Sequence, residues 1–157
     1  MQSESARATT AAEARFRVQA QNSLPRAITA IALDAAAVPI VERLAAAGRR
    51  HATFLTALSR DTLQDLGGQA RRLEDEVAAA DLVVLVAGPG GHAEAAPSIG
   101  DACSRRRVMT TAFLVGAASA SDRDVSKTLA QIRPWSLMVV IANCDDYIDD
   151  MMTALRA

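Results

Sequence analysis

The residues best placed to bind a ligand are the glycines that directly follow the most apolar run of the sequence. The run Leu82–Ala87 contains no polar side chain, and a helix is expected to begin near Ala93. The backbone N–H groups of such a loop and the positive end of the helix can together bind a phosphate. The residues of this glycine loop are Gly88, Gly90, Gly91 and His92. A tight turn without a ligand explains the same glycines, and a histidine at a helix start can also be a solvated cap.

Two polar residues that follow other predicted strands belong to the same candidate site. Asp34 comes directly after Ala27–Leu33, and Asn143 directly after Leu137–Ala142. In open α/β sheets, ligands bind beyond the carboxyl ends of the strands. The positions expected at that end are Asp34, Ser59–Thr62, Gly88–His92, Gly116–Ser119 and Asn143–Asp146. No second catalytic partner for His92 is identifiable, so no catalytic residue is assigned.

The sequence argues against a metal site. The residues that could in principle form a zinc set are His51, His92, Cys103 and Cys144, and their spacing lacks the close pairs of known zinc sites. The acidic residues between positions 145 and 150 could attract a cation, but they equally favour a helix N-terminus. We therefore predict no metal, and we expect both cysteines to be reduced thiols.

The composition indicates one globular domain with an aliphatic core. Of 157 residues, 50% are hydrophobic and 22% are charged, a balance that separates the chain from disordered sequences. The net charge is −1 and no basic cluster is interleaved with aromatic residues, which argues against nucleic acid as a partner. The apolar runs are too short to span a membrane. We expect a soluble, cytoplasmic protein.

The apolar runs predict an α/β fold. Five strands are expected, at Ala27–Leu33, Ala52–Leu58, Leu82–Ala87, Val108–Val115 and Leu137–Ala142. Helical patterns follow each run, including a charged helix at Gln69–Ala79 and a helix that Ser121 begins and Pro134 stops. Because a strand without polar residues needs cover on both faces, the prediction is a doubly wound, mainly parallel five-stranded sheet of Rossmann-like type.

The chain divides into an extension and one domain. Residues 1–24 are predicted to be a helical or flexible N-terminal extension, because Phe16 and Val18 are the only large apolar residues of the marginal helix Ser3–Gln21. Pro25 ends this segment, and residues 25–157 are predicted to form a single Rossmann-like domain.

Four segments resemble the nucleotide-binding, N-terminal domain of the FtsZ/tubulin family, in the same order. The stretch "ADLVVLVAGPGGHAEAAPSIGDAC" is similar to the family's strand and glycine box, with the frame kept at Ala87–Gly91 and Ala95–Pro97. "AITAIALDAAAVPIVERLAAAG" is similar to its first strand, loop and helix. "FLTALSRDTLQDL" resembles the second strand with its "NTD" loop, and "IRPWSLMVVIANCDDY" resembles the strand and loop that help hold the purine.

The departures from this family indicate a degenerate and truncated relative. The family's first glycine loop is replaced by Asp34–Ala37, and the glycines and threonines after Gly91 are replaced by His92–Glu94. Carboxylates at these positions repel a triphosphate unless a metal intervenes. The chain also ends before the family's long central helix, catalytic loop and second domain. GTP hydrolysis is therefore not expected, although enzymatic activity of another kind is left open.

Two functions follow from these observations. The first is a non-catalytic binding or protein-interaction module that meets itself or another protein and holds no cofactor. The alternative is a small nucleotide- or phosphate-ligand-binding enzyme that uses Gly88–His92, with Asp34 or Asp61 holding Mg²⁺ beside GTP or another nucleotide.

Overall fold

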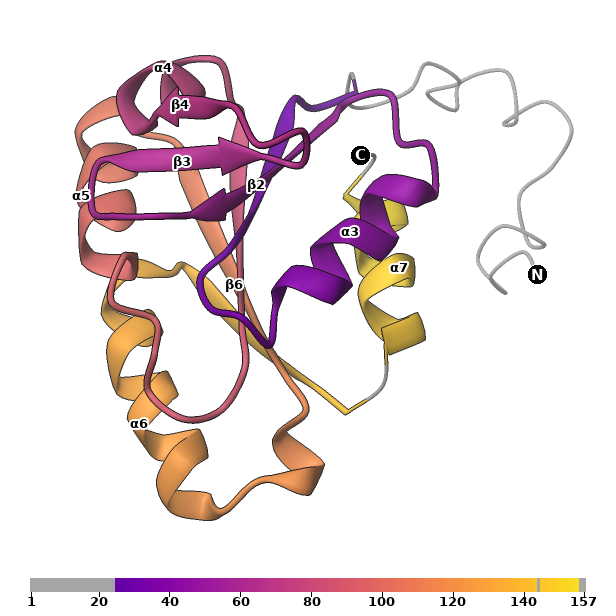
Figure 1. Cartoon of the computed structure of the whole chain (residues 1–157), viewed down its shortest axis with the longest axis vertical. Coiled ribbons are helices and arrows are strands. Elements are labelled where there is room, and N and C mark those ends of the chain that lie inside the picture. The colour runs from indigo at the N-terminus through magenta and orange to yellow at the C-terminus, as the bar shows by residue number, and fades with distance from the viewer. Residues whose placement is uncertain (1–24, 144, 156–157) are drawn as a thin grey trace, which may run out of the picture.

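The protein is a three-layer α/β structure (Figure 1). The computed structural model describes residues 25–143 and 145–155. Its strands are β1 (Ile28–Ala32), β2 (Ala52–Ala57), β3 (Thr62–Asp65), β4 (Ala70–Arg72), β5 (Leu82–Ala87), β6 (Met109–Val115) and β7 (Met138–Ala142). Its helices are α3 (Val38–Ala46), α4 (Leu73–Ala78), α5 (Ala96–Arg106), α6 (Asp122–Ile132) and α7 (Asp145–Ala154), with short 3₁₀ turns η1 (Ala117–Ser119) and η2 (Arg133–Trp135).

The strands form one mostly parallel sheet in the order β4-β3-β2-β1-β5-β6-β7. Central strand β1 pairs in parallel with both β2 and β5, and the parallel arrangement continues through β6 to β7. The chain therefore moves outward from β1 in one direction first and then in the other. The loops that leave β1 and β5 lie at this reversal, which is where open α/β sheets hold their ligands.

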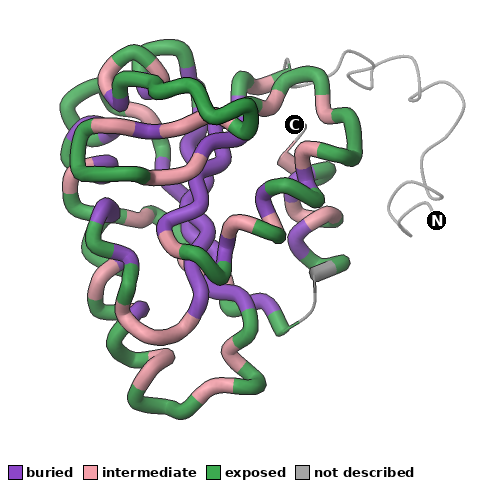
Figure 2. Tube along the Cα trace, viewed as in Figure 1, coloured by how far each residue is buried: buried purple, intermediate pink, exposed green. Residues whose placement is uncertain are grey.

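Helices cover both faces of the sheet. On one face, α4, α5 and α6 pack over a core that includes Val77, Ile99 and Ile132. On the other face, α3 and α7 lie side by side and bury Leu44 and Ile148 (Figure 1). Every residue of β5 is buried, and the buried part of the chain runs along the central strands of the sheet (Figure 2). The expected cover on both faces of Leu82–Ala87 is confirmed.

Local sequence rules explain several helix boundaries. Pro39 lies in the first turn of α3, where its missing N–H costs no hydrogen bond. Gly48, with φ of +71°, follows the end of that helix. Ser121 caps α6 by accepting a hydrogen bond from the Asp124 N–H at 3.2 Å. In α7, the inward face is apolar, and Ile148 and Met152 are fully buried.

The expectation of five strands was wrong at one edge of the sheet, because the segment between β2 and α4 forms an antiparallel hairpin. We expected a helix over Gln69–Ala79, but β4 occupies its first part and α4 spans only Leu73–Ala78. The described part of the sheet therefore has seven strands.

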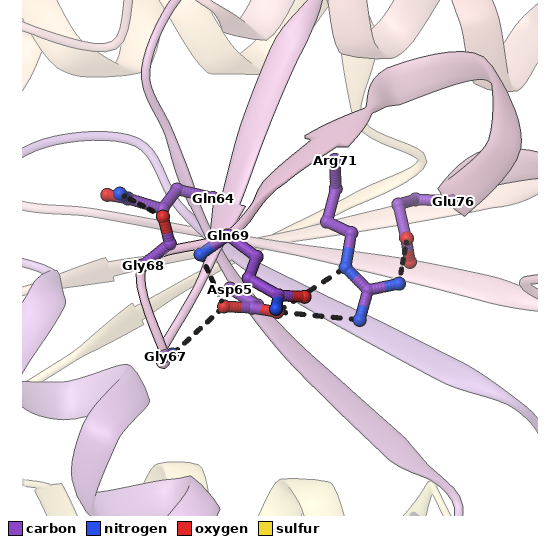
Figure 3. Close-up of polar contacts among 7 residues, drawn as sticks. All are labelled: Gln64, Asp65, Gly67, Gly68, Gln69, Arg71 and Glu76. Carbon is purple, nitrogen blue, oxygen red and sulfur yellow. Dashed lines mark hydrogen bonds and ion pairs between the residues drawn. The ribbon is translucent and has the colours of Figure 1, made fainter.

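The side chain of Asp65 holds the turn of this hairpin together (Figure 3). Its Oδ1 accepts hydrogen bonds from the N–H groups of Gly67 and Gln69, both at 2.9 Å, while Arg71 pairs with its Oδ2 at 3.4 Å. The Gln69 N–H bond is the main reason that the pKa of Asp65 lies below its usual value. Arg71 also reaches Glu76 at 3.6 Å, so the turn is tied to α4.

Three predictions lie outside the described residues. These are the helical or flexible nature of the N-terminal extension 1–24, its marginal helix Ser3–Gln21, and the reduced state of Cys144. Cys103 is buried and forms no disulfide, as expected. Within the ranges given above, the longest apolar helices fall short of what a membrane crossing needs.

Candidate functional site

The loops after β1 and β5 meet at the reversal of the sheet, and Asp34 joins them. Its Oδ1 accepts a hydrogen bond from the Ala37 N–H just before α3, and its Oδ2 accepts one from the Gly88 N–H, both at 2.9 Å. The N-cap position of α3 is Ala37, which has no side-chain cap hydrogen bond, so Asp34 closes the turn before the helix and does not cap it. Both oxygens of this carboxylate are therefore engaged by backbone N–H groups of the protein itself.

Gly88 is a glycine because the two loops approach each other closely. A Cβ atom at this position would lie 2.7 Å from the Cβ of Ala36 and 3.6 Å from the Oδ1 of Asp34. Gly88 is also buried. The close approach that a nucleotide-binding loop reserves for a phosphate is here made by another part of the same chain.

Helix α6 supplies a second set of contacts to the glycine loop. The hydroxyl of Thr128 donates to the carbonyl oxygen of Gly88 at 3.1 Å and accepts from the Gly91 N–H at 2.9 Å. Thr128 is fully buried, so neither bond is shared with bulk water. One side chain thus fixes both ends of the loop, because its hydroxyl donates one hydrogen bond and accepts another.

Two further N–H groups of this segment are bound by α6. The Gly90 N–H donates to the backbone oxygen of Asp124 at 3.3 Å, and the Ala93 N–H donates to the Oε1 of Gln131 at 2.9 Å. Gly90 and Gly91 have φ values of +132° and +78°, which bring these groups toward the helix.

Together, these contacts use the hydrogen-bond donors of the loop within the protein itself. The N–H groups of Gly88, Gly90, Gly91 and Ala93 all donate to acceptors within the chain. A phosphate bound to these groups would have to displace a carboxylate, a hydroxyl, a carbonyl and an amide oxygen. Each displaced bond costs about 1 kcal/mol or more if its partner is left unpaired.

A cavity of about 270 Å³ lies beside this loop, on the side toward β2. It is lined by Leu33, Ala57, Leu58, Ser59, Arg60, His92, Glu94 and Ala95. The side chains of Arg60 and Glu94 carry opposite charges, and both residues are exposed. The cavity could accept a small polar ligand, with Arg60 as the group suited to an anion.

The structure brings most of the predicted site residues together. Asp34 contacts the loop directly through the Gly88 N–H, and His92 lines the neighbouring cavity. The segment that begins at Gly116 also approaches it, since a Cβ there would lie 4.0 Å from Pro89.

Two predicted positions lie elsewhere. Asn143 follows β7 at the edge of the described sheet, and β6 separates β7 from β5, so Asn143 lies two strands away from the glycine loop. Asp61 lines a different cavity together with Arg72 and Glu74. It therefore does not share a site with Asp34.

The residues that sequence reasoning missed all come from α6. Thr128 lies among Val125, Leu129 and Ile132, the inward face of that helix, and a hydroxyl on an apolar face needs a buried partner. This is the pattern that could have indicated its role. Gln131 and Asp124 carry no comparable pattern, because their contacts depend on the tertiary placement of α6.

Neither a metal centre nor an activated thiol is formed by the described residues. Over positions 25–143 and 145–155, no three His, Cys, Asp or Glu residues lie close enough to hold a metal ion. Burial raises the pKa of the Cys103 thiol, and a side-chain hydrogen bond with Thr110 offsets this only in part. The buried Cys103 is therefore protonated at neutral pH and is a poor nucleophile.

No protein-family model matches the chain, and no curated protein is significantly similar to it.

Proposed function

We propose that the chain is a degenerate FtsZ/tubulin-like domain, with a doubly wound sheet, that acts as a non-catalytic binding or protein-interaction module. The observation that carries this proposal is that the N–H groups of the glycine loop donate hydrogen bonds to acceptors within the chain. The N–H groups of the loop and of Ala93 donate to Asp34, Thr128, Asp124 and Gln131. In a nucleotide-binding relative, N–H groups at these positions would bind phosphates instead. The loop keeps a structural role and has lost its ligand.

Electrostatics supports the same proposal. Asp34 has its carboxylate directly on the Gly88 N–H, so a phosphate at that point would meet a negative charge at hydrogen-bond distance. Both oxygens of Asp34 also accept a backbone hydrogen bond, so a Mg²⁺ ion bound there would have to share each oxygen with an N–H group. GTP hydrolysis is therefore excluded from the proposed function.

Titration calorimetry tests the proposal. GTP, ATP, NAD and coenzyme A, each with Mg²⁺, are titrated into the full chain, and the melting temperature is measured with the same ligands. We expect no binding heat and no ligand-dependent shift, because a ligand that binds only the folded state raises the melting temperature. A saturable isotherm with a micromolar Kd for any of the four would refute the claim that the site has lost its ligand.

The cavity beside the loop favours one alternative, a small enzyme or binding protein for a phosphate-bearing ligand. Arg60 and His92 line this cavity, and it lies at the carboxyl end of the sheet. This function predicts that binding is abolished by Arg60→Ala and by His92→Ala. If a ligand binds wild type and both variants equally, the cavity is not its site.

A further inference from the structure

The two edges of the sheet differ in how they are protected. Edge strand β4 has only three residues, all exposed, and two of them are Arg71 and Arg72. Arg71 is held by Asp65 and Glu76. Short, charged edge strands of this kind oppose pairing with another chain.

The opposite edge, β7, has none of these protections. Leu137–Ala142 contains no charged residue and no proline, and β7 pairs only with β6 among the described strands. A strand with one neighbour leaves about half of its backbone N–H and C=O groups without a strand partner. Two large apolar side chains of β7 are exposed, Ile141 by 49% and Met138 by 40%, and Leu137, directly before the strand, is exposed by 80%.

We propose that β7 pairs antiparallel with β7 of a second copy of this chain, which joins the two sheets across a two-fold axis. This inference rests on the proposed function as an interaction module and names the partner. An antiparallel edge pair satisfies the backbone groups of both strands at once. A two-fold axis requires a self-complementary surface, and a strand without charges can face its own copy with no like-charge repulsion.

The side chains of β7 fit such a pairing when Val140 lies on the axis. Val139 packs on the face of α5 and α6, while Val140 and Ala142 pack on the face of α3 and α7. In this register Met138 lies opposite the small Ala142 of the second copy, and Ile141 lies opposite its Val139. Each exposed large side chain therefore meets a smaller one on the same face, where opposed residues pack together.

Sedimentation velocity on the full chain tests the pairing. Wild type, Ile141→Lys and Leu66→Lys are compared from about 1 to about 200 μM, the range over which a micromolar dimer dissociates. Leu66 is a matched control because it is 46% exposed and lies in the turn of the β3–β4 hairpin, far from β7 in the strand order. We expect wild type and Leu66→Lys to dimerise alike, and Ile141→Lys to raise the dimer Kd by about 100-fold, since a lysine ammonium is costly to bury.

A second variant and two outcomes complete the test. Met138→Lys places the charge on the other face of β7 and should weaken the dimer similarly, with circular dichroism confirming that each variant is folded. A wild type that stays monomeric throughout overturns the inference, and so does a dimer that both β7 lysines leave unchanged. If the chain forms an oligomer that neither β7 lysine weakens, the pairing is refuted but the proposed interaction function is not. Nucleotide binding in calorimetry would refute the proposed function, whatever the sedimentation result.

Discussion

Replacing Thr128 with valine removes the hydroxyl that holds the glycine loop and keeps the shape of the side chain. The change eliminates the bond to the Gly88 carbonyl at 3.1 Å and the bond from the Gly91 N–H at 2.9 Å. Because Thr128 is fully buried, water does not replace the lost partner. Each lost bond contributes about 1 kcal/mol, and the two unpaired backbone groups add to this, so the variant should lose about 3 kcal/mol of unfolding free energy.

Thr128→Ser is the matched control for this substitution. It keeps the hydroxyl and removes one methyl group, which costs about 1 kcal/mol. A loss of about 3 kcal/mol lowers the melting temperature of a chain of this size by about 6–12 °C, against about 2–4 °C for the serine variant.

Differential scanning calorimetry measures both melting temperatures, and hydrogen exchange followed by NMR reports on the loop itself. The Gly91 amide should exchange faster in the valine variant than in the serine variant. If Thr128→Val melts within about 1 °C of Thr128→Ser, the hydroxyl does not hold the loop and the reasoning about its closure is wrong.

The remaining predictions concern the loop approach, the hairpin and the buried thiol. Gly88→Ala should lower stability by about 2 kcal/mol through overpacking against Ala36, and Ala36→Gly in the same chain should recover most of that loss in urea unfolding; no recovery would exclude this contact. The pKa of Asp65 is lowered from 3.8, so its stabilising effect is present above that pH and disappears as the pH falls through the folded-state pKa. Asp65→Asn should therefore melt below wild type at about pH 6 but not at about pH 2, and an equal deficit at both would contradict this assignment. In a Cys144→Ser background, Cys103 should react with a thiol reagent only after denaturant is added, because it is buried and its pKa is raised; rapid labelling of the folded chain would contradict that environment.

Apolar runs in the sequence were sufficient to predict the parallel part of the sheet. All five predicted strands are present, and the polar-free run Leu82–Ala87 is β5, buried throughout. The rule that ligand loops meet beyond the carboxyl ends of strands also brought Asp34 together with the glycine loop. These predictions depend on local pattern and on topology rules that hold across α/β folds.

The rest depended on contacts that local pattern does not contain. Strands β3 and β4 have four and three residues, too few to show a period, and the Asp65 turn rather than side-chain alternation fixes their pairing. Sequence order also does not reveal that β7, and with it Asn143, lies at an edge of the described sheet. The closure of the glycine loop by Thr128 joins positions about 40 residues apart, so it required the placement of α6.

The central claim is that the glycine loop is closed to phosphate by the protein's own groups. Its most direct test is an NMR titration of the full chain with GTP and Mg²⁺, which follows the amide resonances of Gly88, Gly90, Gly91 and Ala93. We predict that these four resonances stay unchanged up to about 1 mM GTP, the concentration at which even a weak site would be half filled. Saturable shifts of these amides at micromolar GTP would contradict the account, because they would show that a phosphate displaces Asp34 and Thr128 from the loop.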